Sequence, residues 1–329
     1  MKFSTHGLSV LLTVLLSSAL FSNAVLGAVA ERVKVVTTFS ILEDWVKVVG
    51  GEHVEVHSLV GPDEDVHVYQ ASPSDVQHIA HADLLVMNGL GLEGWLNRVV
   101  SSSGFAGVSL IASKGLRAIG TGGHEHGHEK DEHGQGDHGK SGNQHEGAVA
   151  HGSSDPHAWL SLTAAKTYVH NIERALITTS PAYADYFHQR TVAYIESIDA
   201  LASEMKKQFS MIPVVQRRLV VPHNAFAYLA RDYDIEIYSL QGLSTESETS
   251  AAHIARLVRA IIASDIRAIF AENVMNSRLI EQVVHETGAT LGGRLISGAL
   301  SKKLAPNYLA MMRYNTEQIV RTLKSSMLK

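Results

Sequence analysis

Histidine is concentrated in one stretch of this chain, between Gly122 and His157. Seven histidines stand there among glycine, serine and acidic residues, with few apolar neighbours: His124, His126, His128, His133, His138, His145 and His151. Neutral imidazole offers a lone pair to divalent transition metals near neutral pH, and a tract so poor in apolar residues cannot build a core. The tract therefore indicates metal binding. The alternative is a solvated loop whose histidines bind nothing specific.

Three further histidines share a position relative to the predicted elements. His67 lies just past a predicted strand, His157 follows Pro156 at the end of the histidine-rich stretch, and His223 directly follows another predicted strand. Ligands of open α/β sheets bind at the carboxyl ends of the strands, so this shared position favours one common site over three unrelated loop histidines. Because the chain has no cysteine, a tight site for a first-row metal must use imidazole and oxygen. Three imidazoles would give tetrahedral zinc with a fourth place for water or a carboxylate.

The elements that must position these histidines alternate between strand and helix. In the first half, β-branched and apolar runs predict strands over 33–39, 54–60, 83–88 and 108–112, and helical spacing recurs over 41–49, from Pro73 and over 92–100. In the second half, the strands are predicted over 219–222, 235–240 and 268–271, and the helices over 225–232, 251–263, 277–287 and 306–328. Such alternation predicts parallel sheets.

Two helical segments separate the halves, over 162–179 and 181–209. The second begins at a proline and has no glycine or other proline inside it, so it would extend roughly 40 Å and connect two lobes as a rigid rod. The sequence thus predicts an α/β protein of two Rossmann-like lobes joined by a long rigid helix, with the metal in the interlobe cleft. The expected divisions are an N-terminal lobe over 31–180 that carries the His-rich loop 122–152, a linking helix over 181–210, and a C-terminal lobe over 211–329.

The first thirty residues have the pattern of a cleaved secretory signal. Lys2 precedes an apolar run that ends in the small residues of Ala28-Val29-Ala30, and the run is short for an uncleaved membrane anchor. The absence of cysteine excludes disulfides, thiolate ligands and the acylated cysteine of a lipoprotein, so we expect a soluble periplasmic protein. Loss of the segment removes Lys2 as the single charge and changes the formal net charge from −5 to −6. A mildly acidic chain of this kind does not favour nucleic acid as a partner.

Four strings of the chain resemble one family of metal receptors. They are GPDEDVHVYQASPSD (61–75), NGLGLEGWL (88–96), DPHAWL (155–160) and HNAFAYL (223–229). Together they resemble the ZnuA-like solute-binding proteins of ABC-type zinc and manganese importers, in the order and spacing of that family and over nearly the whole mature chain. The resemblance implies two α/β lobes joined by a long rigid helix, and it implies that His67, His157 and His223 are the metal ligands.

One position departs from the family pattern. Where many members carry an acidic ligand in a string SDALS, this chain has SGALS (297–301), so Gly298 supplies no oxygen. The fourth ligand is then water or an oxygen from Glu64, Asp65 or Glu272, and we expect water because each acid has an ordinary structural role available.

The resemblance implies a periplasmic receptor that captures Zn²⁺ as the transported ligand and delivers it to an inner-membrane ABC permease with its ATPase. Histidine at the third ligand position and a His-rich loop favour zinc over manganese within the family. The competing functions are a manganese receptor or metal-dependent adhesin of the same fold, and a zinc hydrolase or lyase, since three histidines with an open position also occur in catalytic sites. No His-Glu-x-x-His motif supports an enzyme. We expect no enzyme activity and a monomer.

Several other residues have ordinary structural interpretations. The aromatic side chains of Trp95, Trp159, Phe226 and Tyr228 are expected to pack around the site. The acids Glu246 and Glu248 are expected in a solvated loop or helix start. Four histidines on predicted helices are expected to face solvent or to make local bonds: His170, His188, His253 and His285.

Overall fold

The computed structural model describes residues 31–120, 154–246 and 249–327. The predicted signal segment 1–30 and the predicted His-rich loop lie outside these residues. So do all seven histidines assigned to the loop: His124, His126, His128, His133, His138, His145 and His151. Among the described residues, no helix has the length and apolar character that crossing a membrane requires.

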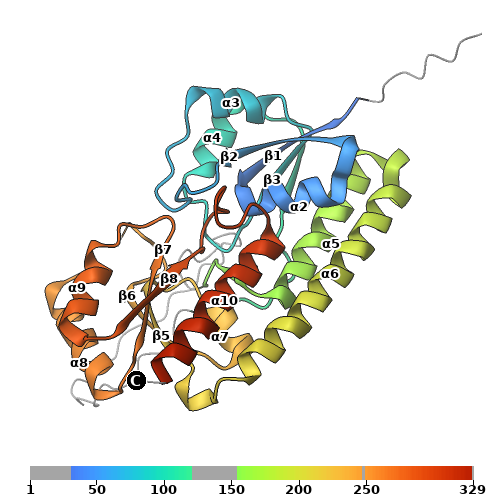
Figure 1. Ribbon diagram of the computed structural model, residues 1–329. Helices are drawn as coiled ribbons and strands as arrows, with labels where there is room; N and C mark the ends of the chain where they lie inside the picture. Colours follow the sequence, from blue (N-terminus) through green and yellow to red (C-terminus); the bar gives the residue numbers. More distant parts are fainter. Residues whose placement is uncertain (1–30, 121–153, 247–248, 328–329) are drawn as a thin grey trace, which may run out of the picture. The chain divides into compact units, whose positions relative to one another are not determined.

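The N-terminal lobe is built on a four-stranded sheet in which every pairing is parallel (Figure 1). Its strands are β1 (Val33–Phe39), β2 (Val54–Val60), β3 (Leu84–Met87) and β4 (Val108–Ile111), in the order β2-β1-β3-β4. The helices α2 (Ser40–Gly50), α3 (Pro73–Ala80) and α4 (Leu96–Ser103) follow the first three strands in the chain. The order reverses beside β1, where β2 lies on one side and β3 on the other, and such switch points are where ligands enter open α/β sheets.

The C-terminal lobe repeats this topology. Its strands are β5 (Arg218–His223), β6 (Glu236–Gln241), β7 (Ala268–Glu272) and β8 (Thr290–Leu295), in the order β6-β5-β7-β8 and again all parallel. Its helices are α7 (Ala227–Tyr233), α8 (Ala251–Ala263), α9 (Arg278–Thr287) and the terminal α10 (Tyr308–Met327). The two parallel α/β lobes confirm the predicted fold class. His223 is the last residue of β5, so this strand delivers it to the carboxyl edge of the sheet.

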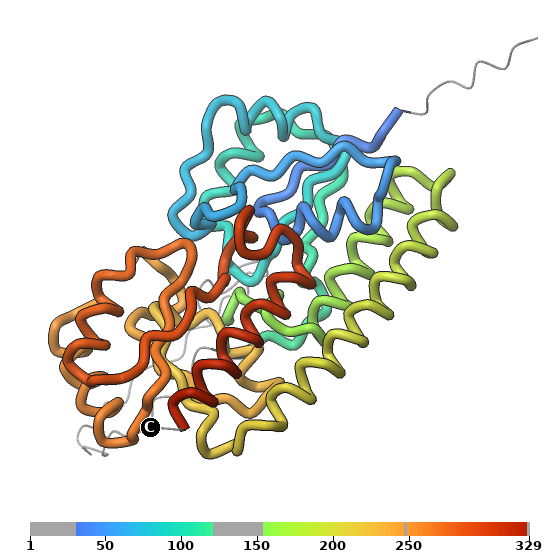
Figure 2. Tube along the Cα trace, in the orientation of Figure 1, coloured from blue at the N-terminus to red at the C-terminus, as the bar shows by residue number. Residues whose placement is uncertain are grey.

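Two antiparallel helices stand between the lobes in the sequence, α5 (Leu162–Thr179) and α6 (Ala184–Ser210) (Figure 2). The side chain of Ser161 caps α5 by accepting a hydrogen bond from Ala164 N at 3.2 Å. Near its start, α6 is tied to the N-terminal lobe, where Arg190 Nε donates to the Val48 carbonyl at 2.6 Å. At its end, the Phe209 ring packs against Tyr233 of the C-terminal lobe with centroids 4.7 Å apart. At 27 residues, α6 is long enough to contact both lobes.

The strand β8 was not predicted, because its sequence TLGGRL contains two glycines and glycine weakens a strand pattern. The structure explains why glycine stands at these two positions. A Cβ at Gly292 would lie 2.4 Å from the Phe270 ring, and a Cβ at Gly293 would lie 2.1 Å from Gln318 of α10. The missing side chains thus allow α10 and the neighbouring strand to approach β8 closely.

Candidate metal centre

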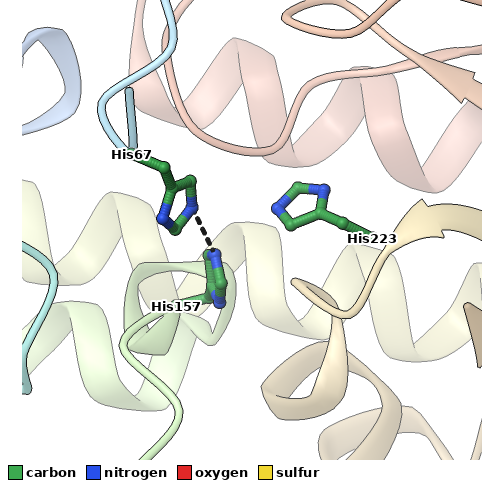
Figure 3. A group of neighbouring side chains, drawn as sticks. All are labelled: His67, His157 and His223. Atoms are coloured by element: carbon green, nitrogen blue, oxygen red, sulfur yellow. Dashed lines mark hydrogen bonds between the residues drawn. The ribbon is translucent and has the colours of Figure 1, made fainter. Parts of the chain in front are cut away.

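Three histidines from separate segments converge at one place (Figure 3). His67 lies on the loop that follows β2, His157 immediately precedes a short 3-10 turn over 158–160, and His223 ends β5. His157 and His223 are fully buried, whereas His67 is half-buried. The structure therefore brings together the three histidines that the sequence singled out, one from each lobe and one from the segment before α5.

The spacing of the imidazoles suits a single ion. The Nε2 atoms of His67 and His157 are 3.1 Å apart, and one nitrogen from each of the three rings lies within 4.8 Å of the other two. Tetrahedral zinc at the usual zinc–nitrogen distance of about 2.0–2.1 Å separates two ligand nitrogens by about 3.3 Å. Small rotations of the rings would therefore allow all three to coordinate one ion.

The ring of His157 is held in place by an acid from its own loop. Asp155 Oδ1 accepts a hydrogen bond from His157 N at 2.9 Å and lies 2.8 Å from His157 Nδ1. Both side chains are buried. A carboxylate on one imidazole nitrogen fixes the tautomer and the ring orientation, so the other nitrogen can present its lone pair to a metal.

A second carboxylate takes the same position behind His223. Glu272 ends β7, the strand beside β5, and its Oε2 lies 2.8 Å from His223 Nδ1. The Glu272 carboxylate also accepts hydrogen bonds from His223 N at 3.2 Å and from Ser297 Oγ. This buried acid therefore lies against the His223 ring and restricts its orientation.

Burial keeps two of the imidazoles neutral. It lowers the pKa of His67 to about 3, with further lowering from the neighbouring His157 and His223, and it lowers the pKa of His157 well below the usual value. Burial, the largest single effect, disfavours the charged form of His223, but the influence of Glu272 together with the charges of Asp65 and Asp155 outweighs it and raises the pKa of that ring. Since metals bind neutral imidazole, His67 and His157 are ready to bind at neutral pH, whereas a proton competes for His223.

The acids that were candidates for a fourth ligand all have structural partners. Glu64 Oε2 accepts from Gly61 N at 2.7 Å. Asp65 uses both oxygens, accepting from His67 N at 2.9 Å and from Thr245 Oγ1 at 2.7 Å. Glu272 lies behind His223, as described above. Within the described ranges, the group of mutually close ligand atoms at this place contains imidazole nitrogens alone.

Gly298 does not need a glycine conformation. Its φ lies outside the left-handed region, and a Cβ built there would make an ordinary contact at 3.9 Å with Cγ1 of Val66, which precedes His67. The position is buried. A side chain at residue 298 would thus begin beside the loop that carries His67.

Aromatic side chains support the segments that carry the histidines. Trp159 donates from Nε1 to the Ser297 carbonyl at 2.7 Å, and Tyr228 donates from its hydroxyl to the Asp155 carbonyl at 2.9 Å. Trp95 donates from Nε1 to the Val66 carbonyl at 3.3 Å. The fourth predicted aromatic residue, Phe226, is fully buried in the core. These contacts go beyond the expected packing because they fix backbone on both sides of the site.

An open pocket of about 1480 Å³ reaches the site at His67. His67 and Pro156 lie on its wall, together with Trp95 from the N-terminal lobe and Leu243 and Ser244 from the loop after β6. Because both lobes contribute to the wall, the pocket is a cleft between them.

The histidines on the helices lie away from the three-histidine site. His170 and His188 each face Glu173, with Nδ1 to carboxylate distances of 3.2 and 2.7 Å, and His253 Nε2 lies 3.4 Å from the Ser239 carbonyl. Glu246 is exposed, and Glu248 lies outside the described ranges.

Comparison with known proteins gives the family. The family model described as ZnuA, zinc-uptake complex component A, periplasmic, matches residues 35–322. The iron-binding protein YfeA of Yersinia pestis is 30% identical over 318 residues, which cover 94% of each chain. The manganese-binding lipoprotein MntA of Bacillus subtilis (strain 168) is 30% identical over 301 residues, covering 89% of this chain and 90% of the relative.

A solved structure supports the same assignment. The periplasmic zinc binding protein TroA from Treponema pallidum superimposes with a TM-score of 0.75 at 27% identity, covering 89% of this chain and 99% of that structure. The family match confirms the resemblance seen in the sequence motifs. The chain therefore belongs to the ZnuA family of periplasmic metal-binding proteins, the substrate-binding components of ABC transporters.

Proposed function

We propose that this protein is a periplasmic zinc receptor that binds Zn²⁺ through His67, His157 and His223 and delivers it to the inner-membrane permease of an ABC importer. One observation carries the proposal. The Nε2 atom of His223 is buried and has no hydrogen-bond partner in the described part of the chain. A buried polar atom without a partner is costly. A metal ion shared with the other two imidazoles would supply the missing interaction.

The ligand chemistry favours zinc over the other metals named for relatives. Those relatives are described as iron-binding, manganese-binding and zinc-binding proteins. Manganese prefers carboxylate, carbonyl and water oxygens, whereas a set of neutral imidazoles suits zinc. The nearby acids already have hydrogen-bond partners, so the ligand atoms that the site offers to a metal ion are imidazole nitrogens. A manganese receptor or a metal-dependent adhesin of the same fold is the alternative.

Competition between Zn²⁺ and Mn²⁺ for the purified mature protein tests this proposal. We expect zinc to displace manganese and manganese to fail to displace zinc at comparable free concentrations. A preference for Mn²⁺ would contradict the zinc assignment and favour the manganese alternative.

Binding and transfer, without catalysis, is the activity we propose. Members of the family are substrate-binding components of transporters. Glu272, Asp65 and Glu64 accept hydrogen bonds from Ser297, Thr245 and a backbone amide, respectively, so these three acids are not placed as free general bases. Turnover of ester, peptide or bicarbonate substrates at enzyme-like rates with bound metal would favour the hydrolase or lyase alternative.

A periplasmic location and a monomeric state complete the proposal. The signal-like segment 1–30 and the periplasmic relatives support export. Some relatives are described as lipoproteins, but this sequence has no cysteine to carry a lipid. We propose that the mature protein is soluble in the periplasm and meets the permease and its ATPase as a monomer.

Deletion of residues 122–152 is expected to leave the three-histidine site nearly intact and to remove additional, weaker zinc equivalents. The ends of the tract are already joined, because Gly120 and Ser154 pair in an antiparallel bridge, so a short connection can replace it. Ligands on a tract with few apolar residues pay ordering entropy when they bind, which weakens their affinity. Calorimetric titration of the full and shortened mature chains measures both classes of site. Loss of the tightest zinc equivalent would show that the tract contributes to the primary site.

The substitution Gly298→Asp is expected to tighten zinc binding. With three imidazoles as ligands, we propose that water fills the fourth position, and a carboxylate placed there would replace it. The backbone at residue 298 accepts a side chain, since a Cβ meets Val66 at 3.9 Å without a left-handed φ. Zinc affinity and melting temperature, measured beside Gly298→Ala, give the result. If Ala is tolerated and Asp brings no gain, the open fourth position is wrong.

A further inference from the structure

A second cluster of possible metal ligands lies on the N-terminal lobe, apart from the three-histidine site. His57 lies on β2, the edge strand of its sheet, and Asp75 and His78 lie on α3. One possible ligand atom from each residue lies within 4.8 Å of the other two. His78 is exposed and Asp75 is buried. The cluster thus joins a strand and a helix at the surface.

The fold fixes the two elements against each other. Ile79 of α3 packs with Leu59 of β2 in a small apolar cluster. His57 is two residues before Leu59 and therefore points to the same face of the strand. Asp75 and His78 are three residues apart and share one face of the helix. Packing of the apolar neighbours consequently brings the three polar side chains together.

The Asp75 carboxylate is held in a fixed orientation. Its Oδ2 accepts hydrogen bonds from Ser72 N at 2.6 Å, Ser72 Oγ at 2.8 Å and the Tyr69 hydroxyl at 2.8 Å. All three bonds go to the same oxygen, so in the described part of the chain Oδ1 has no hydrogen-bond partner. An anchored carboxylate with one available oxygen is preorganised for a cation.

The two imidazoles are stacked, with ring centroids 3.8 Å apart and planes inclined by 22°. Two protonated rings at this distance would repel each other. Burial, and then the nearby His78, lowers the pKa of His57, so the neutral form that binds metal is favoured. The exposed His78 ring can rotate about its side-chain bonds to direct a nitrogen to the same ion as His57.

We propose that His57, Asp75 and His78 form a second binding site for a divalent transition metal ion of the zinc class. Two imidazoles and one carboxylate are a ligand set that zinc uses with a further position open to water. The site differs from the primary one in its carboxylate ligand and in its exposure. An ion there would exchange readily with solvent, in contrast to an ion held by two fully buried histidines.

Residue-resolved labelling tests this proposal on the mature chain with its histidine-rich tract present. Diethyl pyrocarbonate modifies accessible neutral imidazole, and peptide mass spectrometry reports each histidine separately during titration with zinc chloride alone. We expect the labelling of His57 and His78 to fall together with one midpoint. Labelling of His81, which is exposed at the end of α3 and bonded to the Gln77 carbonyl at 2.7 Å, stays constant.

Substituted variants distinguish one ion that binds both His57 and His78 from separate protection of the two side chains. His57→Gln should raise the zinc concentration that half-protects His78 by at least about tenfold, because even loss of an outer-shell partner costs about 10- to 100-fold in metal affinity. His81→Gln, the matched control, should leave that midpoint unchanged. Unprotected His78, unequal midpoints for His57 and His78, or full protection of His78 in His57→Gln would each overturn the proposal. The two midpoints in the unsubstituted chain decide the matter even if His57→Gln folds poorly.

Discussion

Replacing any one of His67, His157 and His223 by alanine is expected to weaken tight zinc binding by about 3 kcal/mol or more, roughly a hundredfold, because few ligands share the binding free energy of a zinc ion. Competition with a chelator of known affinity measures the loss for the tightest equivalent. His285→Ala on the exposed face of α9 is the matched control and should bind as the original chain does.

The three variants are expected to differ in stability without metal. His157 and His223 are fully buried, and each has a buried carboxylate behind it, Asp155 or Glu272. Truncating either ring leaves a cavity and an acid that has lost a partner, so the melting temperature of the metal-free protein should fall. His67 is half-buried on a loop, and its removal should affect affinity with little change in melting temperature. Tight zinc binding that survives one of the substitutions would show that this histidine is not a ligand.

Glu272→Gln is expected to lower zinc affinity by about 10- to 100-fold, the usual cost of losing an outer-shell partner of a metal ligand. Glutamine has nearly the shape of glutamate but carries no charge, so it cannot attract the His223 ring as the carboxylate does with Oε2 2.8 Å from Nδ1. The exposed Glu236 on β6, which pairs with Arg218 at 3.0 Å, gives the matched control Glu236→Gln.

A pH series distinguishes orientation by Glu272 from a general structural role. Glu272 is the largest of the influences that raise the pKa of His223 against the effect of burial. In the original chain, a proton competes with zinc as the pH falls through that raised pKa, and apparent affinity then drops by about tenfold per pH unit. Without the charge the pKa of His223 falls, so the drop begins at lower pH. The difference between the two proteins should therefore be largest at high pH and shrink at low pH, whereas a parallel loss at all pH values would contradict this role.

Alternation of apolar segments was sufficient to predict the two parallel lobes. The strands 33–39 and 54–60 and the helix 162–179 were predicted with the bounds that the structure has. The long helix begins at Ala184 after a 3-10 turn over 181–183, because the turn takes up the proline. The strand β8 was missed since its paired glycines serve the close approach of Phe270 and Gln318, which depends on tertiary contacts that no local pattern contains.

The convergence of the histidines was predictable, but their orientation was not. Sequence motifs and strand ends predicted that His67, His157 and His223 would meet. The contact between Glu272 and His223 depends on strand order and register. The strands β5 and β7 are neighbours, and Val220 pairs with Ile269. Three residues further along both strands, that register places His223 beside Glu272. A sequence that reveals strands without their order cannot show this pair.

Anomalous diffraction from crystals of the mature protein with one equivalent of Zn²⁺, recorded on both sides of the zinc absorption edge, locates the ion and its ligands. We expect one strong peak in the cleft, bonded to one nitrogen each from His67, His157 and His223, with water as the fourth ligand at the normal tetrahedral distance. A strongest peak elsewhere, or a first ligand shell in which Glu272, Asp65 or Glu64 replaces one of the histidines, would contradict this expectation.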